Sequence, residues 1–184
     1  MNHHDMTRNM VLAALFAALT AIGAFLQIPT GTVPITLQFL FTALAGLLLG
    51  WKWGAVSQLL YVGIGLLGLP VFTQGGGIGY VLQPSFGFLL GLIPAAAVIG
   101  ALTARRTGYL TVLAAVLVGD LILYAVGVPY MYLILHVYMQ SAKTFPALLA
   151  AMLVYVPGDT LQIVVVTALA PVLRRTLAKA VPNL

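Results

Sequence analysis

Few side chains in this sequence could do chemistry, and the most informative are a carboxylate and a carboxamide near the C-terminus. Asp159 and Gln162 are three residues apart in the stretch Val-Pro-Gly-Asp-Thr-Leu-Gln, so they share one face of a helix. A carboxylate accepts hydrogen bonds and a carboxamide donates and accepts them, which suits a small ligand with N–H and C=O groups. Pro157 and Gly158 could open a polar pocket there. Asp159 could instead cap a helix that restarts after the proline.

Asp120 is the second buried acidic candidate, in an apolar run near the middle of the chain. A charge in such a run is costly, so Asp120 could be a proton or cation site or a pocket wall. It could equally be a carboxyl group hydrogen-bonded to a neighbouring helix. The spacing alone does not separate these readings, and Asp120 is kept as a ligand-binding candidate.

A glycine-rich loop at residues 70–84 is a third candidate feature. It lacks the Gly-Lys-Ser/Thr ending of a nucleotide-binding loop, so we expect a flexible lid, with Gly77 within it. Gln83 lies near the end of the loop and could point into a site beneath the lid or into water. Ser85 stands where the next helix should start. Both are candidate ligand contacts.

Residue sets typical of enzymes are missing from the sequence. It has no cysteine and only three histidines, and these are not grouped with acidic residues, so we expect no metal and no cofactor. Its serines have no neighbouring histidine and acid, and it has no Walker A motif. The eight basic residues form no patch interleaved with aromatics, which argues against nucleic acid as a partner. These features favour a binding protein over a catalyst.

The composition predicts the elements that position these residues. Of 184 residues, 62% are hydrophobic and 6% are charged, and none is glutamate, so the surface must face membrane lipid rather than water. We expect one all-α transmembrane domain, residues 1–184, with six membrane-spanning helices. Pro129 should end the fifth, so the segment 130–140 should lie in the interface or re-enter. The expected spans are residues 10–28, 35–50, 54–69, 85–103, 109–126 and 146–173.

The basic residues predict the orientation of these spans. Six spans place both termini on one side, and seven of the eight basic residues fall on that side. Basic residues are enriched in cytoplasmic segments, so the termini should be cytoplasmic. The Asp159 end of the molecule and the glycine-rich loop should then be extracytoplasmic. Lys143 is the exception, on the outer side.

The first expected helix carries four alanines at Ala13, Ala14, Ala17 and Ala18. They form two overlapping pairs of small residues four apart, a pattern that lets a second helix approach closely. That neighbour could belong to this chain or to a partner subunit.

Several strings in the sequence resemble one known family. They are Ala13–Thr20, Val33–Gln38 (Val-Pro-Ile-Thr-Leu-Gln), Ala45–Gly50, Gly65–Phe72, Gln83–Phe88 and Pro157–Asp159. Together they resemble the BioY family, the biotin-specific substrate-binding (S) components of energy-coupling factor (ECF) vitamin transporters. The resemblance covers nearly the whole chain.

The resemblance implies a six-helix S-component bundle in a prokaryotic plasma membrane, with biotin bound near the extracytoplasmic end. Asp159 would hydrogen-bond the biotin head group, with Gln38 and Gln83 among the other polar contacts. The alanine strip would dock on a transmembrane coupling subunit, and two ATPase subunits would supply energy. Some members of the family work without these subunits.

Two positions depart from the pattern of the family. A lysine usually stands three residues after Pro-Gly-Asp, where this chain has Gln162, which offers only a neutral hydrogen bond to a carboxylate. The usual Gly-Pro-Thr-Gly-Gly-Tyr is Gln-Pro-Ser-Phe-Gly-Phe at residues 83–88. An S component or solitary carrier for a biotin precursor or another vitamin is therefore the main alternative. Two others rest on the acidic residues: a proton-coupled solitary carrier in which Asp120 titrates, and a small intramembrane enzyme that uses Asp120 and Asp159.

Overall fold

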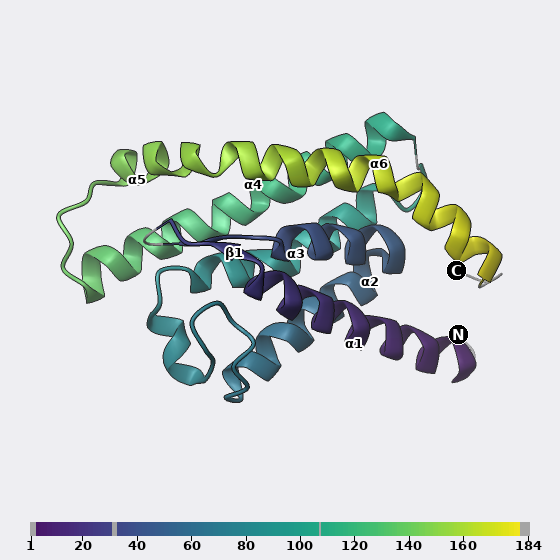
Figure 1. The fold of residues 1–184 in the computed structure, drawn as a ribbon, viewed down its shortest axis with the longest axis horizontal. Coiled ribbons are helices and arrows are strands. Elements are labelled where there is room, and N and C mark those ends of the chain that lie inside the picture. The colour runs from purple at the N-terminus through teal and green to yellow at the C-terminus, as the bar shows by residue number, and fades with distance from the viewer. Residues whose placement is uncertain (1–2, 31–32, 107, 181–184) are drawn as a thin grey trace.

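The computed structural model describes residues 3–30, 33–106 and 108–180, which form a helical bundle with one small β-hairpin (Figure 1). Three short helical turns, at Ile78–Leu82, Ile134–Tyr138 and Met152–Val154, connect or extend the helices. The strands are β1 (Gln27–Ile28) and β2 (Ile35–Thr36), which pair antiparallel. The α-helices are α1 (His3–Phe25), α2 (Gln38–Leu66), α3 (Phe86–Leu102), α4 (Tyr109–Leu133), α5 (Phe145–Ala151) and α6 (Val156–Ala180).

The helices have the lengths and surfaces of a membrane protein, as predicted. In the described part of the chain, four helical stretches are long and apolar enough to cross a membrane: Asp5–Phe25, Gln38–Leu66, Tyr109–Tyr138 and Val156–Arg174. Phe86–Leu102 and Phe145–Val154 are shorter apolar helices. Large apolar side chains such as Leu110, Leu121 and Leu161 are exposed on the outside of the bundle, which suits a surface in contact with lipid.

Helix α2 is a hairpin of two helical segments rather than one straight rod. Gly50 has φ +76° and ψ 178°, a left-handed conformation that glycine adopts without steric cost. Residues 38–49 and 51–66 therefore run back along each other, and Thr42 donates a 3.0 Å hydrogen bond to Gln58 across the pair. The helix break coincides with the boundary expected at residue 50.

One arginine side chain binds backbone carbonyl groups at the ends of two helical segments. The break at Gly50 removes the helical partner of the Leu47 carbonyl, and α3 ends beside Thr103. The guanidinium of Arg174 in α6 donates to the Leu47 carbonyl at 2.6 Å and to the Thr103 carbonyl at 3.3 Å. Arg174 thereby links α6 to the end of the first segment of α2 and to the end of α3.

Helix α4 does not end where the sequence predicts. The expected break at residues 127–129 is wrong, because α4 runs through Pro129 to Leu133 and continues as a π-helical turn to Tyr138. Close packing against α3 holds the helix together here: the rings of Phe88 and Tyr130 lie where a Cβ on Gly127 or Gly87 would fall. Tertiary contacts thus override the local effect of the proline.

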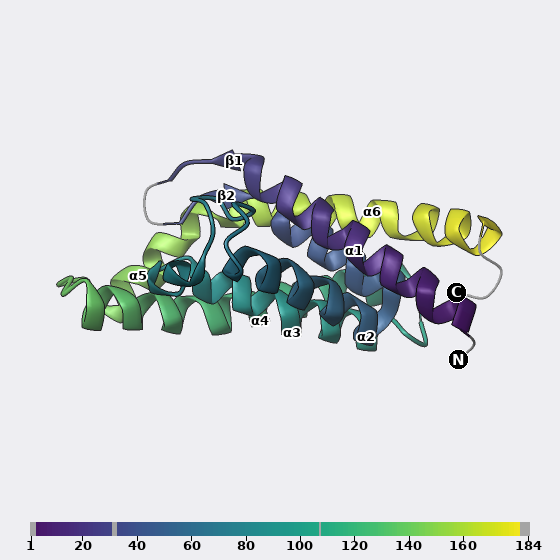
Figure 2. The same cartoon turned by 90° about the horizontal axis from the view of Figure 1, so that it is seen from below.

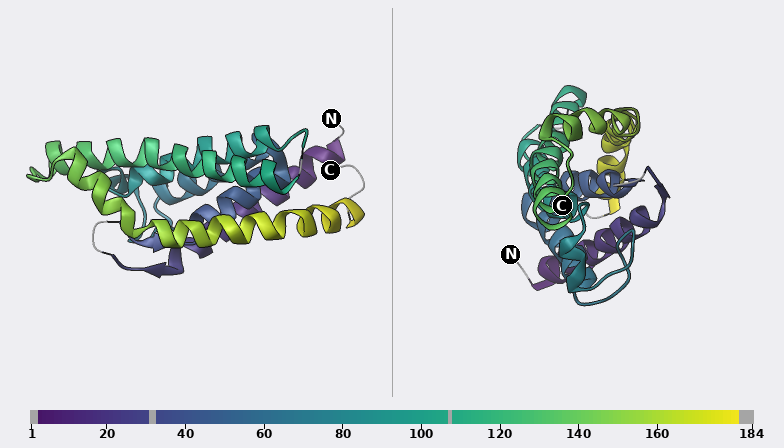
Figure 3. Two further views of the ribbon diagram at one scale, coloured as in Figure 1. Left: turned by 90° about the horizontal axis from the view of Figure 1, so that it is seen from above. Right: turned by 90° about the vertical axis from the view of Figure 1, so that its left-hand side faces the viewer.

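The C-terminal span is also divided differently from the prediction. Helix α5 ends at Ala151, a tight turn covers Met152–Val154, and α6 begins at Val156. Pro157 lies in the first turn of α6, where a missing N–H leaves no helical hydrogen bond unmade. Helices α4 and α6 run side by side and are connected through α5 at the end of the molecule away from the start of α1 (Figure 3).

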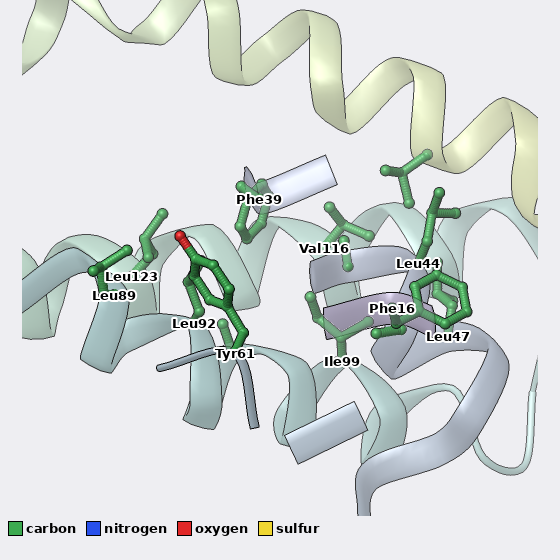
Figure 4. Close-up of a cluster of buried hydrophobic side chains, with 14 of the residues drawn as sticks. Phe16, Phe39, Leu44, Leu47, Tyr61, Leu89, Leu92, Ile99, Val116 and Leu123 are labelled. Atoms are coloured by element: carbon green, nitrogen blue, oxygen red, sulfur yellow. The ribbon is translucent and has the colours of Figure 1, made fainter. Parts of the chain in front are cut away.

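The apolar core lies among α1, α2, α3, α4 and α6. Helix α1 crosses the α2 hairpin on the outside of the bundle (Figure 2). Phe16, Leu44 and Leu47 lie at one end of the core, and Leu89, Leu92 and Leu123 lie at the other (Figure 4). The segment 38–49 rises only about 18 Å along its axis, less than the thickness of a bilayer core. Space therefore remains beyond its first residue.

Candidate functional site

A cavity lies at the start of α2, between the β-hairpin and helices α3, α4 and α6. The space between atoms there is about 660 Å³ when the open mouth is included. Its lining combines apolar and polar side chains. The lining residues are Val33, Pro34, Ile35, Thr36, Gln38, Phe39, Thr73, Tyr80, Ser85, Phe88, Leu89, Leu92, Leu123, Tyr124, Met152, Tyr155, Asp159 and Gln162.

Asp159 enters the cavity from the first turn of α6. The hydroxyl of Tyr124 on α4 donates a short hydrogen bond to Oδ2 of Asp159. This bond orients the carboxylate and leaves Oδ1 for a further donor. Because the backbone N–H of Asp159 bonds to the carbonyl of Tyr155, the residue is part of the restarted helix. The side-chain hydrogen bond of Asp159 runs to Tyr124 of α4, across the helix interface.

Gln162 lies one turn further along the same face of α6 and is only 3% exposed. Its Oε1 accepts a 3.0 Å hydrogen bond from the backbone N–H of Leu40 in the first turn of α2. The first N–H groups of a helix have no partner within the helix. Gln162 therefore caps α2 from another helix, and its amide nitrogen remains for a ligand.

Gln38 is fixed in the cavity wall by hydrogen bonds of defined direction. Tyr61 donates its hydroxyl hydrogen to the carbonyl of Val71 at 3.1 Å, so it accepts from Nε2 of Gln38 at 2.8 Å. Thr36 donates to Oε1 of Gln38 at 2.9 Å. One N–H and one lone pair of the Gln38 amide are left unused by these bonds.

The mouth of the cavity is formed by the glycine-rich loop and the β-hairpin. The hydroxyls of Thr73 and Tyr80 are 2.8 Å apart, and that of Ser85 is 3.4 Å from Tyr80. On the other side, the Tyr155 hydroxyl donates to the carbonyl of Val33. The loop is held in place, because the N–H of Gly77 donates to the Gly65 carbonyl at 2.7 Å.

The structure brings together four of the predicted ligand-binding residues, because Asp159, Gln162, Gln38 and Ser85 all line the cavity. The other three are not among the lining residues. Gln83 and Gly77 flank the lining residue Tyr80 in the chain. Asp120 lies one helical turn before Tyr124, and its buried Oδ1 has no hydrogen-bond partner among the described residues.

The alanine strip of α1 divides between two environments. Ala13 and Ala17 are buried against the rest of this chain, at 0% and 4% exposure. Ala14 and Ala18 are exposed on the outer face of α1. The close neighbour predicted from the spacing is therefore this chain for the first pair, and the second pair is free to meet lipid or a partner.

Sequence reasoning did not find the residues that orient the site. Tyr124 and Tyr61 hold Asp159 and Gln38, yet nothing in their local sequence distinguishes them from other tyrosines. Gln58 was also missed: it is completely buried in α2 and bonds to Thr42, Ser57 and Thr20. A glutamine in the middle of an apolar helix is a signal that could have identified it, since such residues need polar partners.

Comparison with known proteins gives a consistent result. The sequence model of the BioY family matches residues 1–179. A probable biotin transporter BioY from Lysinibacillus sphaericus is 54% identical over 141 residues, which are 76% of this chain and 72% of the relative. The biotin transporter BioY from Thermotoga maritima is 35% identical over 164 residues, which are 89% and 94% of the two chains.

A solved structure extends the comparison to the fold. The crystal structure of the S-component for biotin from an ECF-type ABC transporter has a TM-score of 0.83 to this fold. The two chains are 28% identical, and the match covers 95% of each. The relatives are transporters and not enzymes. With a match along almost its entire length, the chain belongs to the BioY family.

Proposed function

We propose that this chain is the biotin-binding membrane subunit of a vitamin uptake transporter. The observation that carries the proposal is the cavity itself, whose lining contains an oriented carboxylate, an oriented carboxamide and several apolar side chains. This arrangement suits biotin, which joins a polar cyclic urea to an apolar thioether ring and an acid tail. The relatives that share the fold are named for biotin, which supports the assignment of this ligand.

The lining residues have complementary roles in this proposal. Oδ1 of Asp159 accepts an N–H of the urea, and the free N–H of Gln38 donates to a ligand oxygen. Leu89, Leu92 and Leu123 cover the thioether ring with apolar surface. Ser85 adds a hydroxyl at the mouth, and Gln83 and Gly77 act from the adjoining loop.

Direct binding to the purified protein in detergent tests the ligand. We expect biotin to bind with a dissociation constant in the nanomolar-to-micromolar range by isothermal titration calorimetry. Desthiobiotin, a precursor that lacks the sulfur, should bind more weakly because it has no thioether ring to contact the apolar lining residues. Failure of biotin to bind would refute the proposal, and tighter binding of desthiobiotin would favour a precursor as the ligand.

We also propose six membrane crossings in a prokaryotic plasma membrane, with cytoplasmic termini and an extracytoplasmic cavity. The α2 hairpin supplies two of the crossings, and α1, α3, α4 and α6 supply the others. The excess of basic residues toward the end where α1 begins supports this orientation. Biotin would then enter from outside and leave toward the cytoplasm. In the alternative of a solitary carrier, Asp120, which lies in α4 outside the cavity lining, is the candidate site of proton coupling.

Transport in this proposal is driven by an ECF module with a transmembrane coupling subunit and two ATPase subunits. The exposed face of α1 is the proposed docking surface, because Ala14 and Ala18 lie on it with the apolar residues Val11, Leu15 and Ile22. Small residues at this spacing allow a helix of the partner to approach closely.

Substitution Ala18→Leu is expected to reduce copurification of the coupling subunit at least about tenfold, because even a modest loss of helix packing is worth a factor of ten. Biotin binding to the isolated chain should be unchanged, since Ala18 does not line the cavity. Ala114→Leu makes the same change at an exposed alanine on α4 and should leave copurification intact. Equal losses in both variants would contradict docking through α1. Ala17 is unsuitable for this test because it is buried in the core.

A further inference from the structure

The charge of the cavity is unusual for a site that would hold an acid. Among the described residues that line it, Asp159 is acidic and none is lysine, arginine or histidine. The basic residues described at this end of the molecule, His136 and Lys143, are both exposed and outside the lining. A ligand carboxylate in the cavity therefore meets a negative group and no cation.

The start of α2 does not replace the missing cation. The N-terminus of a helix attracts anions through its unpaired N–H groups and its dipole. Two of these donors are already bonded, because the N–H of Gln38 reaches Oγ1 of Thr36 at 3.4 Å and that of Leu40 reaches Oε1 of Gln162 at 3.0 Å. Little donor capacity is left there for a carboxylate.

Gln162 itself offers the ligand only a neutral donor. Its oxygen is used by Leu40, so the amide N–H₂ group is what remains for a ligand. A neutral N–H can donate to the carbonyl of an amide or ester as well as to a carboxylate, although the carboxylate is the stronger acceptor. A cation discriminates between them more, because it also attracts the charge of the carboxylate.

We propose that this cavity recognises its ligand by the urea and the ring system and does not require a free acid, with the tail lying against the amide of Gln162. The inference rests on the proposed biotin function and extends its substrate class to neutral biotin amides and esters. An amide is a weaker hydrogen-bond acceptor than a carboxylate. Amidation of the tail also removes its repulsion from Asp159, and this gain offsets the weaker hydrogen bond.

Calorimetry with biotin and biotinamide on the purified protein tests this inference. The two compounds differ only in the acid group. Their dissociation constants should agree within about threefold, because the weaker hydrogen bond of the amide and the removed repulsion from Asp159 offset each other. A loss of more than threefold on amidation would overturn the inference while leaving biotin binding intact. Absence of binding by either compound would instead refute the proposed function.

Gln162→Lys supplies the cation that the cavity lacks. We expect biotin to be favoured over biotinamide by about tenfold or more in this variant, because charge-assisted hydrogen bonds are roughly twice as strong as neutral ones. The lysine cannot accept from Leu40, but any resulting loss of stability affects both ligands, so their ratio stays interpretable. Gln74→Lys makes the same change at an exposed glutamine outside the lining and should leave the ratio unchanged. An unchanged ratio in Gln162→Lys would show that the tail lies elsewhere and contradict the inference.

Discussion

Asp159→Asn is expected to weaken biotin binding by about 10- to 150-fold, which corresponds to one lost charge-assisted hydrogen bond of roughly 1.5–3 kcal/mol. The side chain keeps its size, and its oxygen can still accept the hydrogen bond that Tyr124 donates to Asp159. The atom turned toward the ligand then becomes an N–H₂ group, which meets the N–H of the urea as a second donor. Calorimetric titration of the purified variant with biotin measures the effect.

Asp120→Asn is the matched control, because it makes the same chemical change one helical turn before Tyr124. Asp120 does not line the cavity, so its replacement should leave the dissociation constant within about twofold, as for a substitution without contact to the ligand. Equal losses in the two variants would show that the negative charge acts at a distance, and the direct role of Asp159 would be wrong. Uptake by cells carrying Asp120→Asn would separately test proton coupling through this residue.

The elements of the fold were largely predictable because apolar runs and helix breakers act locally. Gly50 and Pro70 mark places where the chain leaves a helix, and the sequence shows both. Pro129 was misleading because its effect depends on packing: Gly127 lies directly against Phe88 of α3, and that contact stabilises a helix that a proline would otherwise interrupt. Such contacts join residues far apart in the chain.

The part of the site that lies on a single helix could be predicted from the sequence. Asp159 and Gln162 share a face of α6, and their spacing alone predicts a common pocket. The partners that orient them, Tyr124 and Leu40, come from α4 and α2, and no local pattern identifies these pairings. Gln162 shows the consequence: its sequence position suggests a ligand contact, whereas its oxygen also holds the start of another helix.

The helix that begins at the cavity also packs closely against α3, and Gly46 is one of the residues at this close contact. A Cβ at this position would lie 2.4 Å from the carbonyl oxygen of Ala96. Backbone atoms cannot rotate away from such a contact, so the two helices would have to separate. The separation would also disturb packing further along the same interface. There, Gly100 of α3 lies against the backbone of Gly50 and Trp51.

Gly46→Ala should therefore lower the midpoint of thermal unfolding in detergent by about 2–10 °C, the range expected for an overpacking cost of roughly 1–3 kcal/mol in a chain of this size. Gly63→Ala is the control in the same helix, since nothing lies within 4 Å of its added Cβ. Alanine favours the helix by about 0.5–1 kcal/mol over glycine, so this midpoint should stay level or rise. Because the propensity term is common to both substitutions, opposite shifts isolate the contact with Ala96. Shifts of the same sign and size would mean that α2 and α3 can separate without cost, and that close packing at Gly46 does not stabilise the bundle.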